Sequence, residues 1–212
     1  GPMAKPPERS AAQFVDPKAS LAALRKAAAG CTGCDLYLHA TQTVFGEGPE
    51  SADVMLIGEQ PGDSEDVEGR PFVGPAGKVF DAVLAEAGIE RDKAYVTNAV
   101  KHFKFERRGK RRLHSRPNAG EVRACRWWLD KELGFIRPRL AVALGATAAL
   151  ALTGRALPVT KMRGQRVARA DGLDVFLTIH PSFILRIREE ADKQAERARF
   201  LADMRAVREL MG

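Results

Sequence analysis

The sequence predicts a three-layer α/β/α fold around a central four-stranded parallel sheet. Four short apolar runs have the length of buried strands, stretches with helical periodicity separate them, and glycines or polar residues close each run. Strands that alternate with helices form βαβ units, and the resulting parallel sheet is covered by helices on both faces. With 212 residues, the chain is long enough to bury a core without disulfides.

The four strands are expected at 53–57, 94–98, 140–144 and 175–179. In parallel sheets of this kind, ligands bind outside the carboxyl ends of the strands. Those ends carry the segment 58–62 (GEQPG), Asn98, Gly145 and the segment 180–182 (HPS). Three of the four provide polar side chains that suit recognition of a small heterocycle. We therefore expect a binding site at this edge of the sheet.

Helices are expected at 16–30, 75–87, 118–133, directly after Gly145, and at about 189–211. Asp16 before Pro17 is typical of a helix N-terminus, and a glycine follows the second helix as a stop signal. Asn118 and Glu121 have the spacing of a capping box, which indicates the start of the third helix. The last helix is amphipathic and highly charged, so we expect it to pack with one face and to expose the other.

Residues 16–212 are expected to form a single domain, because no internal repeat and no linker divides them. Residues 1–15 are rich in proline, serine and alanine and are expected to be disordered, with Gly1-Pro2 resembling the remnant of a cleaved tag. No apolar run approaches the length needed to span a bilayer, and no secretory signal is visible. We therefore expect a monomeric cytoplasmic protein of bacterial type, without contact to membranes.

Residues 101–116 (KHFKFERRGKRRLHSR) carry eight Lys or Arg and one Glu, a net charge of +7 that equals the net charge of the whole chain. Cations at this density are expected to be solvated or to face a polyanion, of which nucleic acid is the commonest. His114 lies inside this segment as a candidate nucleophile. The alternative is that His114 is one more polar residue of a solvated basic loop.

Cys31 and Cys34 have CxxC spacing, and the third cysteine, Cys125, is far away in the sequence. His102 is a candidate for the fourth ligand, because it follows the second strand on the way to Cys125. Three thiolates and one imidazole suit either zinc or an iron–sulfur cluster, and the residues alone do not separate the two. The alternative is a CxxC turn with Cys125 as a core residue. His39 is interpreted as a surface residue or a neighbour of the metal.

Four motifs together resemble the uracil-DNA glycosylase superfamily, and specifically its iron–sulfur branch, family 4. The resemblance extends from about Cys31 to Arg186. The motifs are 58–62 (GEQPG), 69–77 (GRPFVGPAG), 95–101 (YVTNAVK) and 180–186 (HPSFILR). Each motif alone would be weak, but their combination is specific. The resemblance implies the uracil-DNA glycosylase fold, uracil-containing DNA as the substrate, with single strands favoured, and free uracil as a product.

Three departures from ordinary family 4 resemble the UdgX branch. They are Gln60 in the first motif, His102 where family 4 has its third cysteine ligand, and an insert that carries Lys110-Arg-Arg-Leu-His114. The resemblance to this branch implies uracil excision followed by a stable covalent bond between His114 and the DNA. It also implies a 4Fe–4S cluster. The implied ligands are Cys31, Cys34, His102 and Cys125.

The resemblance assigns the base pocket to residues of three motifs. Asn98 would read uracil O4 and N3–H, which cytosine does not match, and Phe72 would stack on the ring. His180 would donate a hydrogen bond to uracil O2 as negative charge develops there. Gln60 and Asp63 would complete the pocket, Asp63 through its backbone, with Gln60 near the sugar or the loop.

The remaining assignments concern DNA and the sugar. Ile184 would insert into the base stack as an aliphatic wedge, although simple core packing is the alternative for this residue. Ser182 and Arg186 would contact phosphates, and Arg112 and Lys110 of the basic segment would stabilise the loop or contact the backbone. Glu59 would position His114 or take its proton. His114, Glu59, His180 and Gln60 are thus the predicted catalytic set.

Two other functions stay open from the sequence. The first is a conventional family 4 uracil-DNA glycosylase that uses water and turns over. The second is a metal-stabilised nucleic-acid-binding module without catalysis. The basic segment alone is compatible with covalent capture, with turnover and with binding without catalysis, because binding a polyanion requires only the charges.

Overall fold

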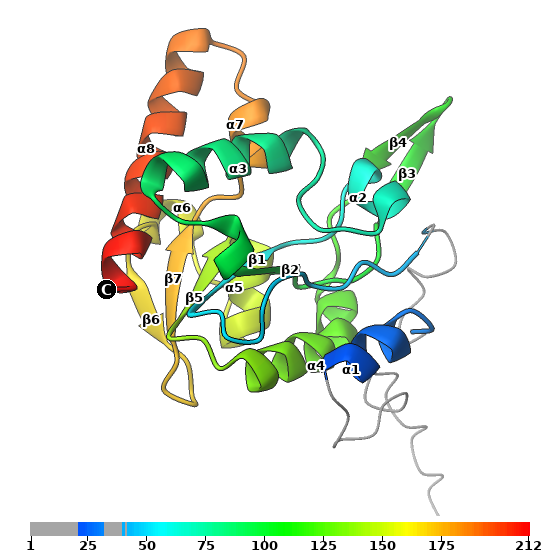
Figure 1. Ribbon diagram of the computed structural model, residues 1–212. Helices are drawn as coiled ribbons and strands as arrows, with labels where there is room; N and C mark the ends of the chain where they lie inside the picture. The colour runs from blue at the N-terminus through cyan, green and yellow to red at the C-terminus, as the bar shows by residue number, and fades with distance from the viewer. Residues whose placement is uncertain (1–20, 32–39, 41) are drawn as a thin grey trace, which may run out of the picture.

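The computed structural model describes residues 21–31, 40 and 42–212. A five-stranded sheet with the order β2-β1-β5-β7-β6 forms the centre of the molecule (Figure 1). Its first four strands run parallel, which confirms the predicted four-stranded parallel sheet. An antiparallel edge strand, β6, was not predicted. The strands are β1 Val54–Gly58, β2 Tyr95–Asn98, β5 Leu140–Leu144, β6 Arg166–Ala168 and β7 Asp174–Thr178.

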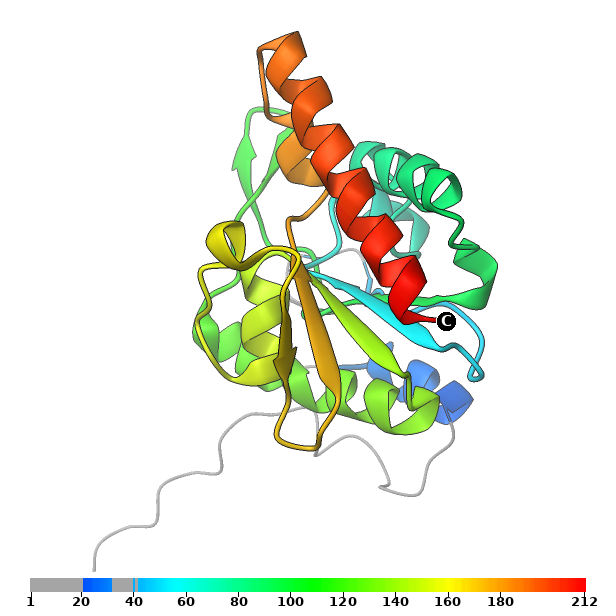
Figure 2. The same ribbon diagram turned by 90° about the vertical axis from the view of Figure 1, so that its left-hand side faces the viewer.

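Helices cover both faces of the sheet, as expected for the three-layer class (Figures 1 and 2). Helices α3 (Pro75–Ala87) and α8 (Glu190–Leu210) pack on one face, and α1 (Leu21–Ala28), α4 (Ala119–Ile136) and α5 (Ala146–Thr153) pack on the other. Successive residues of β1 alternate between the two cores, because side chains of a strand point to opposite faces. The short elements are α2 Asp63–Glu68, η3 Arg91–Lys93, α6 Val159–Met162 and α7 Ser182–Leu185.

The predicted helix signals act as expected where the structure describes them. The Asn118 side chain accepts a hydrogen bond from Glu121 N at 2.9 Å, and the Glu121 carboxylate accepts one from Asn118 N at 2.8 Å. This capping box starts α4, which runs three residues past the predicted end to Ile136. Gly88, with φ +81°, ends α3 at the predicted residue. The expectations for residues 1–15, for the start of the first helix, for Cys34 and for His39 lie outside the described residues.

The basic segment forms a β-hairpin, where the sequence suggested a solvated loop. Strands β3 (Phe105–Arg108) and β4 (Arg111–His114) pair antiparallel and project from the body of the molecule (Figure 1). Arg108 pairs with Arg111, so the connection is the two-residue turn Gly109-Lys110. Gly109 adopts φ +62°, the left-handed region that tight hairpin turns require. The hairpin therefore holds His114 at a defined end of β4.

Lys101 corrects the expectation that every cation of the basic segment is solvated. Its side chain is fully buried and forms an ion pair with Glu132 of α4, which is also fully buried. The ammonium group also donates to Thr97 Oγ1 at 2.6 Å and to the Asn98 carbonyl at 2.7 Å. All three ammonium protons thus have acceptors, which is what allows a charged lysine inside the protein. No described helix is long and apolar enough to cross a membrane.

Candidate active site

A cleft of about 1060 Å³ opens at the carboxyl ends of the parallel strands. Residues that follow β1, β5 and β7 line it together with Asn98 at the end of β2 and with Leu113 and His114 of the hairpin. The four strand ends that the sequence suggested as a binding site thus lie around one cavity. This agrees with the general position of ligand sites in open α/β sheets.

Gly58, the last residue of β1, forms a point on which three of the predicted base-pocket side chains converge. A Cβ atom at this position would lie 2.5 Å from Asn98 Oδ1, 2.7 Å from Phe72 Cζ and 3.2 Å from His180 Nε2. These side chains come from three different segments of the chain. Their closeness to one Cα shows that the structure builds a compact polar and aromatic corner at the end of β1.

The hydrogen bonds of His180 define its tautomer. The backbone N–H of Ser182 donates to His180 Nδ1 at 3.0 Å, and a backbone amide can only donate. In the neutral ring the proton must therefore be on Nε2, the nitrogen that faces Gly58 and the cleft. Burial lowers the pKa of His180 from 6.5 to about 4. At neutral pH the side chain is thus an uncharged donor aimed into the cleft.

Phe72 contributes the aromatic surface of this corner. Its ring stacks on Phe80 with ring centroids 4.6 Å apart, and it lies nearly parallel to the His180 ring at 5.8 Å. Phe72 is buried and has φ +54°, a left-handed conformation that is rare for a bulky residue. Asn98 is also buried. The corner is therefore held by packing before any ligand enters it.

His114 and Glu59 meet at the rim of the cleft. His114 Nε2 lies 3.0 Å from Glu59 Oε1, and Thr147 Oγ1 donates to the other carboxylate oxygen at 2.7 Å. Burial is the largest single influence on Glu59 and opposes its ionisation, but the hydrogen bonds from His114 and Thr147 outweigh it, so its pKa is lowered. The carboxylate is thus ionised and oriented toward an imidazole that is 49% exposed.

Gln60 fixes the base of the hairpin and also lines the cleft. Its amide oxygen accepts from Lys104 N at 2.7 Å, and its amide nitrogen donates to Ser115 O at 2.8 Å. Lys104 and Ser115 flank the two paired strands. One buried side chain therefore ties both ends of the hairpin to the segment that follows β1. The sequence expectation had placed Gln60 in the base pocket and near the sugar or the loop. Its side chain lies at the base of the loop and in the wall of the cleft, and its role toward uracil stays a prediction.

Arg112 fixes the hairpin from its other side. Its guanidinium donates to Asp63 Oδ1 and to Asp66 Oδ2, both at 2.6 Å, and lies 5.3 Å and 5.1 Å from the ring centroids of Phe103 and Phe105. Asp63 accepts from Arg112 through its carboxylate and, at 3.4 Å, through its backbone carbonyl, and the suggested role of its backbone in the base pocket stays a prediction. Asp66 is fully buried and was not singled out from the sequence.

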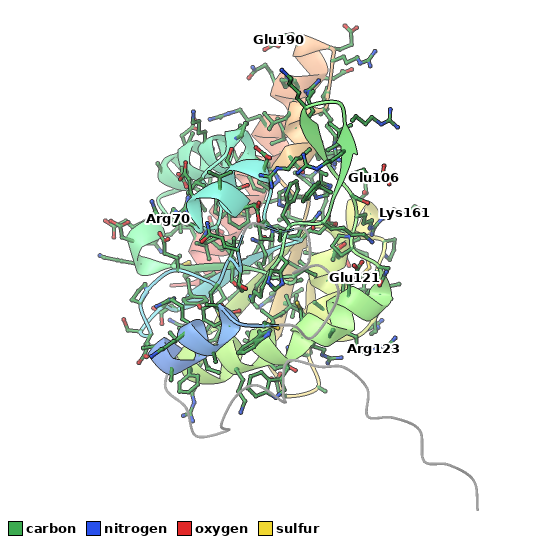
Figure 3. The ribbon with its side chains drawn as sticks, turned by 90° about the vertical axis from the view of Figure 1, so that its right-hand side faces the viewer. Arg70, Glu106, Glu121, Arg123, Lys161 and Glu190 are labelled. Atoms are coloured by element: carbon green, nitrogen blue, oxygen red, sulfur yellow. The ribbon has the colours of Figure 1, made fainter. Side chains whose placement is uncertain are left out.

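The outer part of the hairpin is exposed. Lys110 occupies the turn at its tip and does not line the cleft. At its base, Lys104 Nζ forms an ion pair of 2.7 Å with Glu121 in the first turn of α4, which lies below the hairpin in Figure 3. Glu106 lies on the hairpin itself (Figure 3). The outer cations, Arg107, Arg108, Lys110 and Arg111, are thus exposed to solvent, while Lys104 and Arg112 anchor the hairpin to other elements.

The wedge assignment of Ile184 does not fit the structure. Ile184 is only 3% exposed and packs in the core between the sheet, α3 and α8, so it is not available for insertion into a base stack. Its neighbours Phe183 and Leu185 are each 40% exposed and line the cleft. The core-packing alternative therefore applies to Ile184. Ser182 and Arg186 line the same part of the cleft, as their predicted contacts with DNA require.

The predicted metal ligands are described in part. Cys31 and Cys125 are buried in the core to which α1 and α4 contribute. His102 is also buried and follows β2 by four residues in the sequence. His102 Nε2 lies 2.7 Å from Thr43 Oγ1, while its buried Nδ1 has no hydrogen-bond partner among the described residues. A buried ring nitrogen in this state suits a metal ligand. Within the described ranges no three candidate ligands gather, and Cys34 lies outside them.

Thr147 is a site residue that the sequence reasoning missed. It is buried in the first turn of α5 and holds the Glu59 carboxylate. A sequence signal existed, because α5 begins directly after β5 at the edge where the strand ends meet. A hydroxyl in the first turn of such a helix is placed to contact residues that follow a neighbouring strand.

Comparisons with known proteins agree with this geometry. Residues 45–205 match the sequence profile described as the uracil DNA glycosylase superfamily. The chain is 39% identical over 159 residues to a type-4 uracil-DNA glycosylase of Thermotoga maritima, a match that covers 74% of this chain and 79% of the relative. It is 35% identical over 182 residues to a type-4 uracil-DNA glycosylase of Pyrobaculum aerophilum, covering 82% and 86%. The chain belongs to the uracil-DNA glycosylase superfamily.

Proposed function

We propose that this protein excises uracil from DNA, preferably single-stranded, and then captures the sugar covalently through His114. The observation that carries the proposal is the pairing of His114 with Glu59 at 3.0 Å on the rim of the cleft that holds Asn98, Phe72 and His180. The corner proposed to bind the base and the proposed nucleophile, His114, thus line one cavity. Membership of the superfamily supports the excision step, and the hairpin supports the capture step.

Base recognition follows from the groups around Gly58. The Asn98 side-chain amide can donate to uracil O4 and accept from N3–H. Cytosine offers an amino group at C4 and no proton on N3, so it would leave buried polar groups unpaired at a cost of about 1–3 kcal/mol. His180 Nε2–H is placed to donate to uracil O2. The Phe72 ring would support the face of the base.

Bond cleavage moves charge in two directions. The electron pair of the N-glycosidic bond leaves with the base, which becomes a uracil anion, and the sugar C1′ becomes an oxocarbenium-like cation. A neutral His180 that already points its proton into the cleft stabilises the anion without reorganisation, an effect of about 2.7–4 kcal/mol for one preorganised donor. The ionised Glu59 lies at the rim of the same cavity, where it favours the cation.

Capture requires a lone pair on the His114 ring, which only the neutral imidazole has. The ring nitrogen that carries this lone pair forms a bond to C1′, and the ring becomes an imidazolium. Glu59, at hydrogen-bond distance and held by Thr147, accepts the surplus proton. The product is a neutral imidazole bonded to the sugar, which has no good leaving group. Such an adduct would persist.

The DNA strand would pass along the rim of the cleft. Leu185 and Phe183 are the exposed apolar residues there, and we assign the wedge that supports base flipping to Leu185, with Phe183 beside it. Ser182 and Arg186 would contact phosphates close to the flipped nucleotide. Lys110 and the other exposed cations of the hairpin would contact the backbone farther away.

We also propose a 4Fe–4S cluster held by Cys31, Cys34, His102 and Cys125, because the donor set fits either zinc or an iron–sulfur cluster and the resemblance to the iron–sulfur branch favours the cluster. Its contribution would be structural, because it would tie the segment after α1 and the segment after β2 to α4. His102 and Asn98 follow one another closely at the end of β2. The ligand set would therefore fix the chain that leads from the base pocket to the hairpin.

A turning-over glycosylase that uses water is the competing function. The type-4 relatives favour it, because they share long matches with this chain. In that reading Glu59 would orient a water molecule and His114 would be a bystander at the rim.

One experiment separates these functions. The purified protein is mixed with a single-stranded oligonucleotide that contains one uracil, and with a matched oligonucleotide that contains thymine. Covalent capture predicts release of one uracil per protein and a band of raised mass that survives SDS and heat. Turnover without capture predicts many uracils per protein and no such band. Salt-sensitive binding with neither result would indicate a non-catalytic binding module.

Replacing Gly58 with alanine tests the base corner. The added methyl group would clash with Asn98 Oδ1 and Phe72 Cζ, so these groups must move from their positions. Overpacking of this kind costs about 1–3 kcal/mol, and the same cost on the bound base would lower the rate of uracil excision by roughly fivefold to 150-fold. Gly134, where a Cβ meets nothing within 4 Å, provides the control variant Gly134→Ala. An unchanged excision rate in Gly58→Ala would contradict the proposed position of the base.

The pKa of His180 predicts a pH dependence of stability. The ring titrates at about 4 in the folded protein and near 6.5 in the unfolded chain. Between these values the unfolded chain binds more protons, so the free energy of unfolding should fall as the pH drops from 6.5 toward 4, by at most about 1.4 kcal/mol per pH unit from this group. Urea unfolding at several pH values, compared with His180→Asn, measures this contribution. Parallel curves for both proteins would contradict it.

A further inference from the structure

The loop that presents Phe72 is held in a strained conformation by two side chains of opposite charge. Phe72 has φ +54°, and a bulky residue in the left-handed region persists only where the surrounding structure imposes it. Such strain is often found where a side chain must be held ready for a ligand. The contacts of the four consecutive residues 71–74 show what imposes it here.

Arg91 holds the carbonyl side of this loop. Its guanidinium donates to Pro71 O at 2.6 Å and to Phe72 O at 2.8 Å, and it is itself anchored by Asp81 Oδ1 at 2.6 Å. The Arg91 side chain is 18% exposed and extends from the turn η3. A planar guanidinium with several donors is suited to hold two neighbouring carbonyl groups at once.

Glu65 holds the amide side of the same loop. Its Oε2 accepts from Val73 N at 2.8 Å and from Gly74 N at 2.5 Å, and its Oε1 accepts from Gly62 N at 3.0 Å. One carboxylate thus joins the Phe72 loop to the segment that follows β1. Gly77 leaves the space for this arrangement, because a Cβ there would lie 2.2 Å from Phe72 O.

We infer that Arg91 and Glu65 are positioning residues for base recognition. A cation on the carbonyls of residues 71 and 72 and an anion on the amides of residues 73 and 74 fix the peptide groups on both sides of the Phe72 side chain. The ring is thereby held against Gly58, beside Asn98 and His180. Arg91 does not line the cleft, so its role would be exerted through the loop, whereas Glu65 also lines the cleft. The inference rests on the proposed function, because it requires that Phe72 supports the flipped uracil.

The test compares Arg91→Ala with Lys93→Ala, which removes an exposed cation from the same turn without contact to the loop. The inhibition constant of free uracil is the main measurement, since product binding reports the base pocket without DNA contacts. Arg91→Ala should raise it roughly tenfold, which corresponds to about 1.4 kcal/mol. Affinity for thymine-containing single strands should not change. Arg91→Lys should recover part of the loss, whereas Lys93→Ala should behave like the unchanged protein.

A double-mutant cycle with Phe72→Ala distinguishes the possible failures. If Arg91 acts through Phe72, Arg91→Ala should add little in the Phe72→Ala background. Full additivity would overturn the positioning role, and so would normal uracil inhibition in Arg91→Ala while Phe72→Ala is impaired. If Phe72→Ala itself binds uracil normally, the proposed contact between Phe72 and the base is wrong, and the positioning role fails with it.

Discussion

Replacing His114 with serine should abolish the SDS-resistant adduct while uracil release continues over many turnovers. A serine hydroxyl is a weak nucleophile without a strong base, so the adduct should fall from near-stoichiometric to below about 1% of the protein. The base corner at Gly58, Asn98 and His180 lies apart from His114 in the chain and keeps its contacts in the variant. The shorter side chain leaves room for water beside Glu59, which then reaches C1′ in place of the imidazole.

The matched control is Glu106→Ser. Glu106 lies in β3 of the same hairpin and does not line the cleft. The control variant should form the adduct as the unchanged protein does. Mass spectrometry of the digested adduct should find the sugar on the peptide that contains His114. An adduct of normal yield in His114→Ser would show that another group captures the sugar. Loss of both uracil release and adduct would show that His114 takes part in excision itself.

The sequence predicted the parallel sheet well because each of its strands is buried on both faces. The segment 140–144 is a continuous apolar run closed by Gly145, and the strand has these bounds in the structure. The edge strand β6 escaped prediction for the opposite reason. Its residues Arg166 and Ala168 are exposed, and only the partly buried Val167 packs against the core, so the three residues give little apolar pattern.

The hairpin escaped prediction because its strands carry charge on exposed positions and have no apolar alternation. Gly109, between two pairs of cations, is a turn signal. The interpretation of this segment rested on its charge and did not use that signal. Arg112 and Lys101 show that the number of charges in a segment does not predict which of them are exposed. Both contribute to the basic segment in the sequence, yet one binds Asp63 and Asp66 and the other lies fully buried against Glu132. Composition counts charges but does not show their partners.

The site residues divide in a similar way. Motif positions at the strand ends, such as Asn98 and His180, lie at the cleft because strand ends meet at one edge of a parallel sheet. Ile184 and Leu185 are equally apolar neighbours, and only the packing of α7 decides which of them is exposed. Gln60 could be placed near the hairpin from the motif, but its hydrogen bonds to the backbone of Lys104 and Ser115 depend on how the hairpin folds back.

Replacing Lys101 with methionine should destabilise the protein by about 3–5 kcal/mol, because Glu132 would remain as a buried carboxylate without its cation. Urea unfolding should show this loss as a lower midpoint with an unchanged slope. Lys93→Met is the control, since Lys93 is 80% exposed and pairs only with the exposed Glu90 at 2.7 Å among the described residues. It should leave the urea midpoint close to that of the unchanged protein, because exposed ion pairs contribute little to stability.

The double variant Lys101→Met/Glu132→Leu decides whether the buried pair matters for more than charge balance. Apolar groups of similar volume often replace a buried ion pair without loss of stability, so the double variant should recover part of the free energy of unfolding. Lys101 also donates to the carbonyl of Asn98 at 2.7 Å, and no apolar side chain restores that bond. The recovery should be incomplete, because the buried hydroxyls of Tyr95 and Thr97 also donate to Glu132 and lose this acceptor. We therefore expect a folded double variant whose uracil excision stays slower than that of the unchanged protein. Full recovery of both properties would show that the end of β2 needs no support from Lys101.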